Sequence, residues 1–318
     1  MGITKFIARR LAFGVLTLLI VSIFVFALTQ ALGDPVKAIL GRDALPDVVT
    51  ARRAELGLDR PVLTQYWDWL TGLLTGDPGT SFTTDVPVLD VVGDRVWNSL
   101  FLMAISAAVS IPISIVIGSY AAARRDKAFD AASSQSSRIL ASMPEFVTGL
   151  LLLVLFSTNV WHIFPAVVRI RPGEPPWVDM QALVLPVLTL TLAVVPYVSL
   201  VMRASMIEVL ESDYIEMARL KGLSERTVVW RHALPNAIGP TLQVIALNIA
   251  FLVGGVIIVE YLFNYPGIGL ALRDAVRDVN VPVVQFIAIL MAGIYVIVNL
   301  LADVGTILVT PRLRTRLR

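Results

Sequence analysis

The sequence predicts an all-α integral membrane protein with six membrane-spanning helices. Of the 318 residues, 56% are hydrophobic and only 16% are charged, whereas soluble domains carry about 25% charged residues. Several apolar runs reach or approach the ~20 residues that a helix needs to cross a bilayer. A water-soluble globule of this composition would expose large apolar patches. The length of the runs therefore favours a membrane protein over a soluble protein with a large core.

The composition also excludes several kinds of site. The chain has no cysteine, which rules out disulfides, thiol nucleophiles and thiolate metal sites. Its two histidines, His162 and His232, fall on opposite sides of the membrane in the predicted topology and cannot form one site. The net charge is only +2, and no basic face indicates a nucleic-acid partner. We expect no metal and no cofactor on this chain.

Residues 1–32 predict a cytoplasmic N-terminus followed by the first spanning helix. Lys5, Arg9 and Arg10 precede the apolar run Leu11–Leu32. A signal peptide is the alternative, but its apolar core covers only ~7–15 residues before a small-residue cleavage site. This run is longer and ends in Gly-Asp-Pro, so we expect a retained helix.

Residues 33–95 form the one long polar stretch, which is predicted to be extracytoplasmic. Glycine and proline punctuate it, and Tyr66, Trp67 and Trp69 recur at near-helical spacing among leucines. An interfacial helix with an aromatic belt and a surface that docks a partner explain this pattern equally well.

Residues 96–310 are predicted to be the core of the protein, with five further spans. The expected spans are Val96–Ala123, Ile139–Val160, Ala182–Met202, Gly239–Leu262 and Val283–Val309. Pro112, Pro186 and Pro196 lie inside spans, where a proline removes one backbone hydrogen bond and bends the helix. Bent helices around a path and ordinary packing both account for these prolines.

The distribution of Lys and Arg predicts the orientation of the spans. Basic clusters lie at the N-terminus, at 124–138, at 203–231 and in the tail 311–318, and even numbers of crossings separate them. They therefore share one side, which the positive-inside rule makes the cytoplasm. The arginines of the 33–95 loop are an exception that its length tolerates, because the rule weakens beyond ~60 residues.

The segment Ser212–Gly239, within a predicted cytoplasmic loop of residues 203–238, mixes charged and apolar residues at helical spacing. Ser212 or Asp213 can cap a first helix, and Gly222 can end it in a left-handed conformation. Ser224 can cap a second helix, which Leu234-Pro235 is predicted to end or bend. A solvated amphipathic loop and a docking site for another protein carry about equal weight on composition alone.

Several motifs of this chain resemble those of ABC importer permeases. Glu216-Met217-Ala218, then Gly222, then Leu234-Pro235, is similar to the EAA signature of that family, although Met217 replaces a small residue and His232 an aliphatic one. ELGLDRPVLTQYWDWL and GDPGTSF in the outer loop, VEYLFNYPGIG after the fifth span and PRLR near the C-terminus resemble the subgroup that imports dipeptides, oligopeptides and nickel chelates. The motifs stand in the right order along the whole chain.

The resemblance implies a type I ABC importer permease fold and a set of partners. It implies a second similar permease chain, two ATP-binding subunits or domains that carry ATP and Mg, and an extracytoplasmic solute-binding protein, in a bacterial inner membrane. It implies that the EAA loop contacts an ATPase, with these coupling residues: Asp213, Glu216, Met217, Ala218, Lys221, Gly222, Leu234 and Pro235. It also implies that the outer loop helps to receive the binding protein, through Tyr66, Trp67, Trp69, Asp77 and Ser81.

Polar residues within the spans are candidates for the translocation path. They are Asn248, Glu260 and Asn299, although asparagines in spans more often bond neighbouring helices. Glu145, Glu260 and Asp303 are predicted to lie near helix ends, where structural pairing or hydration is the favoured role.

Other functions fit less well. The chain lacks a G-x-x-x-x-G-K-[ST] motif for ATP and a G-x-S-x-G elbow, so ATP hydrolysis is expected on separate subunits. A proton- or sodium-coupled secondary transporter is the main rival, yet no clear internal repeat is visible. The solute stays open among peptides, nickel chelates, glutathione-like thiols and haem, with peptides favoured.

Overall fold

The computed structural model describes residues 3–41 and 43–309. The basic tail predicted at 311–318 and the loop arginine at position 42 lie outside the described residues. The described chain is helical throughout, apart from loops and a single isolated bridge between Thr80 and Pro87. Its elements are α1 (Ile3–Gln30), α2 (Pro35–Leu40), α3 (Pro46–Glu55), α4 (Val62–Thr75), α5 (Val88–Ala123), α6 (Ala128–Ser142), α7 (Glu145–Leu153), a π-helical turn (Val154–Thr158), α8 (Met180–Leu210), α9 (Asp213–Leu220), α10 (Glu225–Thr227), a second π-helical turn (Val228–Ala233), α11 (Leu234–Leu262), α12 (Ile268–Arg277) and α13 (Val281–Val309).

Among the described residues, five helices are long and apolar enough to cross a membrane, and α6 with α7 adds a sixth crossing if that bent pair is one span. The five are α1, α5, α8, α13 and the continuous stretch Glu225–Leu262. The spanning helices start earlier than predicted, and the largest shift next to the outer loop is that of α5, which begins at Val88 instead of Val96. The long outer loop is shorter than predicted for the same reason, and it contains the three helices α2, α3 and α4.

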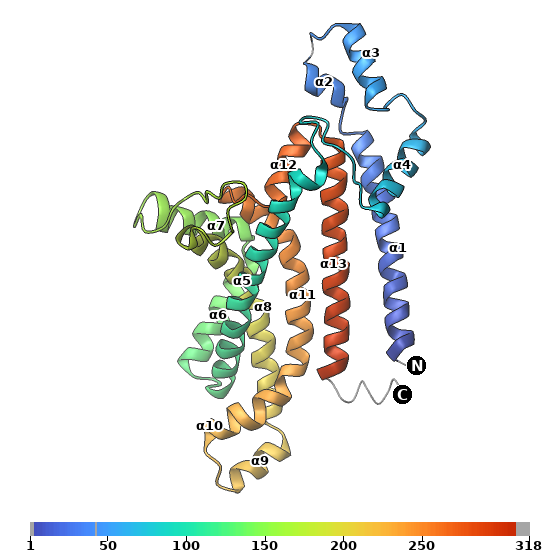
Figure 1. Ribbon diagram of the computed structural model, residues 1–318. Helices are drawn as coiled ribbons and strands as arrows, with labels where there is room; N and C mark the ends of the chain where they lie inside the picture. Colours follow the sequence, from blue (N-terminus) through green and yellow to red (C-terminus); the bar gives the residue numbers. More distant parts are fainter. Residues whose placement is uncertain (1–2, 42, 310–318) are drawn as a thin grey trace.

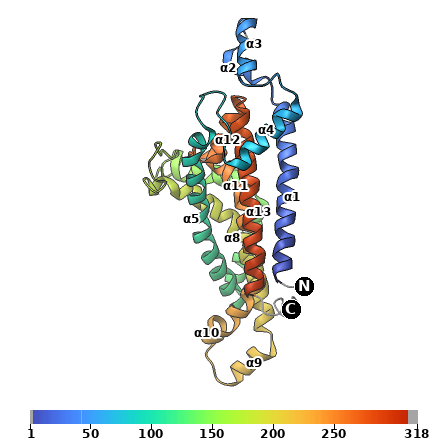
Figure 2. The ribbon, with the colours of Figure 1, turned by 45° about the vertical axis from the view of Figure 1, so that its right-hand side comes forward.

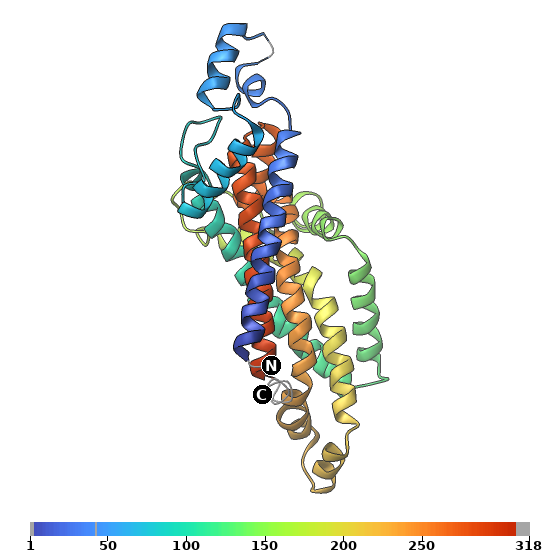
Figure 3. The same ribbon diagram turned by 90° about the vertical axis from the view of Figure 1, so that its right-hand side faces the viewer.

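The third span differs from the prediction of one helix over Ile139–Val160. The helix breaks at Met143-Pro144, and α6 and α7 meet at an angle of 104°. Met143 is extended, with φ −92° and ψ 131°, because a residue before proline avoids the helical region. Figure 3 shows α6 running along the bundle and the chain turning sharply at its upper end.

The core lies where α5, α8 and α11 meet. Leu102, Leu185, Leu190, Leu252 and Val259 are fully or almost fully buried there. The helices approach closely because small residues stand at the contacts. A Cβ on Gly118 of α5 would lie 2.5 Å from the Ser199 carbonyl oxygen of α8.

Helix α1 packs along α13 at the side of this core (Figure 1). A Cβ on Gly14 would lie 2.7 Å from Val296 Cγ1 of α13, so the two helices also touch closely. Arg10 pairs with Asp303 at 2.9 Å, which gives Asp303 the structural pairing expected of it.

The two ends of the bundle carry different elements. Figures 1 and 2 show α2, α3, α4 and α12 at one end, and α9 and α10 at the other. The described start of α1 lies toward the α9 end. The outer loop and the loop of residues 203–238 therefore lie on opposite sides of any membrane that the bundle crosses.

Candidate functional site

The segment between α8 and α11 forms two short helices around a glycine turn, as predicted. Gly222 follows α9 with φ +79°, and its N–H donates to the Arg219 carbonyl at 2.9 Å. A Cβ at this position would meet no heavy atom within 4 Å. The requirement for glycine here is therefore conformational and not steric.

The caps of the two helices follow the prediction in part. The Ser224 hydroxyl accepts a bond from the Thr227 N–H at 3.4 Å, which confirms the second cap. Ser212 stands at the N-cap of α9, but its hydroxyl donates back to the Val209 carbonyl and makes no cap bond.

The prediction that Leu234-Pro235 ends the second helix is wrong, whereas the chain does change direction between α10 and α11 (Figure 1). Residues Glu225–Leu262 form one continuous helical stretch. The π-helical turn Val228–Ala233 precedes Pro235, which falls in the first turn of α11. Within a continuous stretch a proline removes one backbone hydrogen bond, and both prolines and π-helical turns are common sites of a bend.

Helix α9 has a buried and an exposed face. Ile215 is fully buried and Ala218 is 8% exposed, in a cluster with Met202 and Met206 of α8 and with Val228 of the π-helical turn. The close approach that Ala218 permits is thus to its own chain. The exposed face carries large apolar side chains, namely Tyr214, Met217, Leu220 and Leu223.

Three of the predicted coupling residues, Asp213, Glu216 and Lys221, are exposed on this segment. They form no ion pair within residues 3–41 and 43–309. Arg219 instead pairs with Glu225 at 2.8 Å and closes the glycine turn. Arg125, just after α5, pairs with Glu211, and a cavity of about 180 Å³ lies beside these pairs. The charged groups that stay available on α9 surround its exposed apolar face.

The aromatic residues of α4 divide between packing and exposure. Tyr66 and Trp69 stack against Phe26 of α1 with ring centroids 5.3 and 5.8 Å apart, and the Tyr66 hydroxyl bonds Ser22 at 2.9 Å. Trp67 is 54% exposed. Of these three side chains, Trp67 is therefore the one that a partner can reach most readily.

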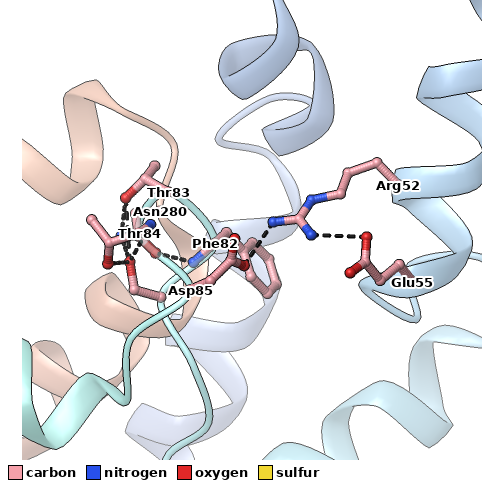
Figure 4. Close-up of polar contacts among 8 residues, drawn as sticks. Arg52, Glu55, Phe82, Thr83, Thr84, Asp85 and Asn280 are labelled. Carbon is pink, nitrogen blue, oxygen red and sulfur yellow. Dashed lines mark hydrogen bonds and ion pairs between the residues drawn. The ribbon is translucent and has the colours of Figure 1, made fainter.

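Ser81 and Asp77 hold the outer loop in shape. Ser81 is 1% exposed, and the Asn280 amide between α12 and α13 donates to its hydroxyl at 2.8 Å. Asn280 also accepts from the Phe82 N–H at 3.1 Å (Figure 4). Asp77 is exposed, and its carboxylate accepts from the Gly79 N–H at 3.0 Å.

Arg52 ties the same loop to α3. It pairs with Asp85 at 2.7 Å and with Glu55 at 2.8 Å (Figure 4). These two carboxylates raise the pKa of the Arg52 guanidinium. The α2–α4 region is thus fastened to the end of the bundle by polar contacts rather than by a large apolar core.

Glu260, a predicted path residue, is fully buried in a network that joins three elements. Its carboxylate accepts from the Ser99 hydroxyl of α5 and from the Gly269 N–H of α12 at 2.6 Å. A Cβ on Gly267 would overlap the Glu260 carboxylate. Glu260 thus holds the VEYLFNYPGIG segment against α5, which is the structural role that the sequence favoured, and its part in a translocation path stays a prediction.

The two asparagines make local contacts. Asn248 donates to the Val244 carbonyl at 2.8 Å, and Asn299 to the Tyr295 carbonyl at 2.9 Å, each within its own helix. Neither side chain bonds another helix among the residues that the structure describes.

The sequence prediction missed two charged groups. Asp130 of α6 is 3% exposed and makes a bidentate ion pair with Arg203 of α8, with Nη2 to Oδ2 at 2.6 Å. The sequence analysis used Arg203 only as part of the basic cluster at 203–231, and no sequence pattern indicated that it pairs with Asp130. Glu145 lies at a helix end, as predicted: it is the first residue of α7, at the α6–α7 break, and its Oε2 is buried with no hydrogen-bond partner among the described residues. Among the described residues, no group of three or more His, Cys, Asp or Glu could hold a metal ion.

A bundle of long apolar helices with an amphipathic loop at one end and a folded polar loop at the other defines a polytopic membrane protein. Residues 114–315 match the family of binding-protein-dependent transport system inner membrane components, and residues 3–103 match the N-terminal domain of such components. The chain belongs to this family.

Full-length relatives agree. The chain is 35% identical over 311 residues to a probable peptide ABC transporter permease protein of Sinorhizobium fredii, covering 97% of this chain and 99% of the relative. It is 34% identical over 313 residues to a putative peptide transport system permease protein of Brucella abortus (98% and 99%). It is 35% identical over 311 residues to a glutathione transport system permease protein of Salmonella typhimurium (98% and 99%).

Family membership confirms the predicted class of protein and fold. The chain is an all-α permease component of an ABC importer with the type I fold. Such a component works with ATPase and binding-protein components. The membership does not favour the rival prediction of a secondary transporter.

Proposed function

We propose that this chain is the permease subunit of an ATP-driven importer for peptides, and that α9 is the element through which the ATPase drives it. The names of the relatives support a peptide or a peptide-like thiol such as glutathione as the solute. The chain forms half of the path, and a second, similar permease chain forms the other half. ATP and Mg bind to two ATPase subunits or domains at the α9 end, which faces the cytoplasm together with both termini.

The observation that carries the coupling role is the exposed apolar face of α9. Met217 and Leu220 are 53% and 74% exposed on a helix whose opposite face is fully buried. A short helix at the end of a bundle gains little from exposed apolar side chains, whereas a partner groove buries them at roughly 25 cal/mol per Å². Asp213, Glu216 and Lys221 at the edge of this face supply charge complementarity, which steers association.

The mechanism follows from how α9 is attached. Its buried face packs on α8 and on the π-helical turn that leads into α11. A push on α9 therefore moves the ends of α8 and α11 together. In an alternating-access cycle, ATP binding closes the ATPase dimer and opens the path outward, and hydrolysis resets it.

Leu220→Glu tests the proposal, because this change places a charge in the proposed contact without disturbing the core. We expect the ATPase to be lost on co-purification and peptide uptake in proteoliposomes to fall at least tenfold. Leu45→Glu is the matched control, since Leu45 is similarly exposed (70%) at the opposite end of the molecule. It should keep the ATPase bound. Normal ATPase binding and uptake in the Leu220→Glu variant would contradict the coupling role.

Residues at the outer end are proposed to receive the binding protein. Trp67 and Asp77 are exposed there and can contact it directly. Tyr66, Trp69 and Ser81 contribute through the packing and hydrogen bonds that hold α4 and the following loop in place.

A further inference from the structure

The most unusual polar group in the spans is Glu145, at the first position of α7. Its Oε2 is buried, and it accepts no hydrogen bond from any residue that the structure describes. The carboxylate lies against α11, where a Cβ on Gly255 would come within 2.7 Å of Oε2. Gly255 is seven residues before the end of α11, so the carboxylate sits ~10 Å below the end of that helix.

A cavity of about 450 Å³ opens beside this carboxylate, at the α6–α7 break. Its walls include Met143, Phe146, Tyr197, Phe251 and Ile258. The other polar groups in these walls are satisfied within the chain: the Tyr197 hydroxyl donates to the Ala141 carbonyl at 2.9 Å, and the Ser142 hydroxyl to the Ile139 carbonyl at 2.7 Å. Glu145 is thus the polar group of the cavity that is left for a ligand.

A carboxylate at membrane depth is costly unless a cation or hydrogen-bond donors compensate it. Three other acidic groups in the spans have such partners, with Asp130 on Arg203, Asp303 on Arg10, and Glu260 on Ser99 and Gly269. For Glu145 no Lys, Arg or His of the described chain forms an ion pair. The aromatic and aliphatic walls offer a surrounding of low polarity, which would strengthen the attraction to an incoming cation.

We infer that the cavity at the α6–α7 break is a substrate subsite of the translocation path, in which Glu145 receives the α-ammonium group of a peptide. The inference rests on the proposed peptide function. A peptide supplies what the cavity lacks. Its α-ammonium group is a compact cation with three N–H donors, and its side chains can contact the apolar walls. Gly255 leaves the space in which the carboxylate lies.

The test compares Glu145→Gln with the wild type in the assembled transporter, reconstituted with its ATPase, second permease and binding protein. Uptake of a free-amine dipeptide is measured against uptake of the same dipeptide N-acetylated. The same binding protein is present in both assays, so its own selectivity cancels in the ratio of the two variants. We expect Glu145→Gln to lower the ratio of free to acetylated peptide uptake at least tenfold while ATPase stimulation by the loaded binding protein persists.

Two further variants separate this role from a structural one. Glu145→Asp should restore part of the preference, because it keeps the charge. Ser142→Ala, in the wall of the same cavity, should leave the preference unchanged. An unchanged preference in Glu145→Gln, whatever its total uptake, would overturn the inference.

Two other outcomes would also overturn it and are distinguishable. Loss of the second permease on co-purification of Glu145→Gln would show that Glu145 pairs with that chain. Failure of the wild-type assembly to import any peptide, with ATPase coupling intact, would refute the proposed solute class and the subsite with it.

Discussion

At Gly222 a single backbone angle decides how the coupling segment turns. The residue has φ +79° in open space, so a side chain there is disfavoured by conformation alone, at ~1–2 kcal/mol. At Gly267 the requirement for glycine is steric instead, because the Glu260 carboxylate fills the volume that a Cβ would need. The two positions show why glycine is required for different reasons in the two loops.

Gly222→Val should therefore uncouple ATP hydrolysis from uptake while the protein still inserts and folds. The strain falls on the α9–α10 turn and reorients the exposed face of α9. The measurement is peptide uptake per ATP hydrolysed in proteoliposomes, and we expect a decrease of several-fold.

Gly222→Asn is the control for this prediction, since asparagine tolerates the left-handed conformation. It should retain most of the coupling. Equal coupling in the valine variant and the wild type would contradict a role for this turn.

At the scale of elements, close helix contacts hold α5 against α8, and a proline breaks the third span. Gly118 allows the backbones of α5 and α8 to touch, and Asp130 with Arg203 fastens α6 to α8. Helix α9 is fixed by its buried face on α8 and on the π-helical turn. The coupling element is thus joined to two spans, and the α6–α7 break is what brings Glu145 against α11.

Gly118→Ala should destabilise the α5–α8 contact by ~1–3 kcal/mol, because the added Cβ would lie 2.5 Å from a backbone oxygen. The thermal unfolding midpoint of the detergent-solubilised complex should fall.

Gly254→Ala is the matched control for Gly118→Ala. It makes the same change within a spanning helix at a position where a Cβ meets nothing within 4 Å. It should leave the midpoint unchanged or raise it slightly, because alanine is the better helix former by up to ~1 kcal/mol. Equal midpoints for the two variants would contradict the proposed close contact.

At the scale of the whole molecule, the folded outer loop and the coupling loop lie at opposite ends of the bundle (Figure 2). The positive-inside rule assigns the α9 end to the cytoplasm. The chain has no native cysteine, so single cysteines can report this orientation directly.

Glu216→Cys and Trp67→Cys should label from opposite sides of intact cells with a membrane-impermeant maleimide. Trp67→Cys is expected to react from outside, and Glu216→Cys only after permeabilisation. Both side chains are exposed on this chain, so when it is expressed without its partners the membrane alone decides which site is labelled. Labelling of both sites from the same side would contradict the topology.

The sequence by itself determined the helical membrane class and the Gly222 turn, because each depends on local properties: apolar length for the first and backbone conformation for the second. The resemblance carried by the EAA-like loop and VEYLFNYPGIG then led to the correct family. Only the tertiary structure decided that Ala218 and Ser81 face inward, that Glu260 bonds Ser99, and that Glu145 lies unpaired beside Gly255. These are contacts between residues far apart in the chain, so no local pattern encodes which partner, if any, a side chain meets.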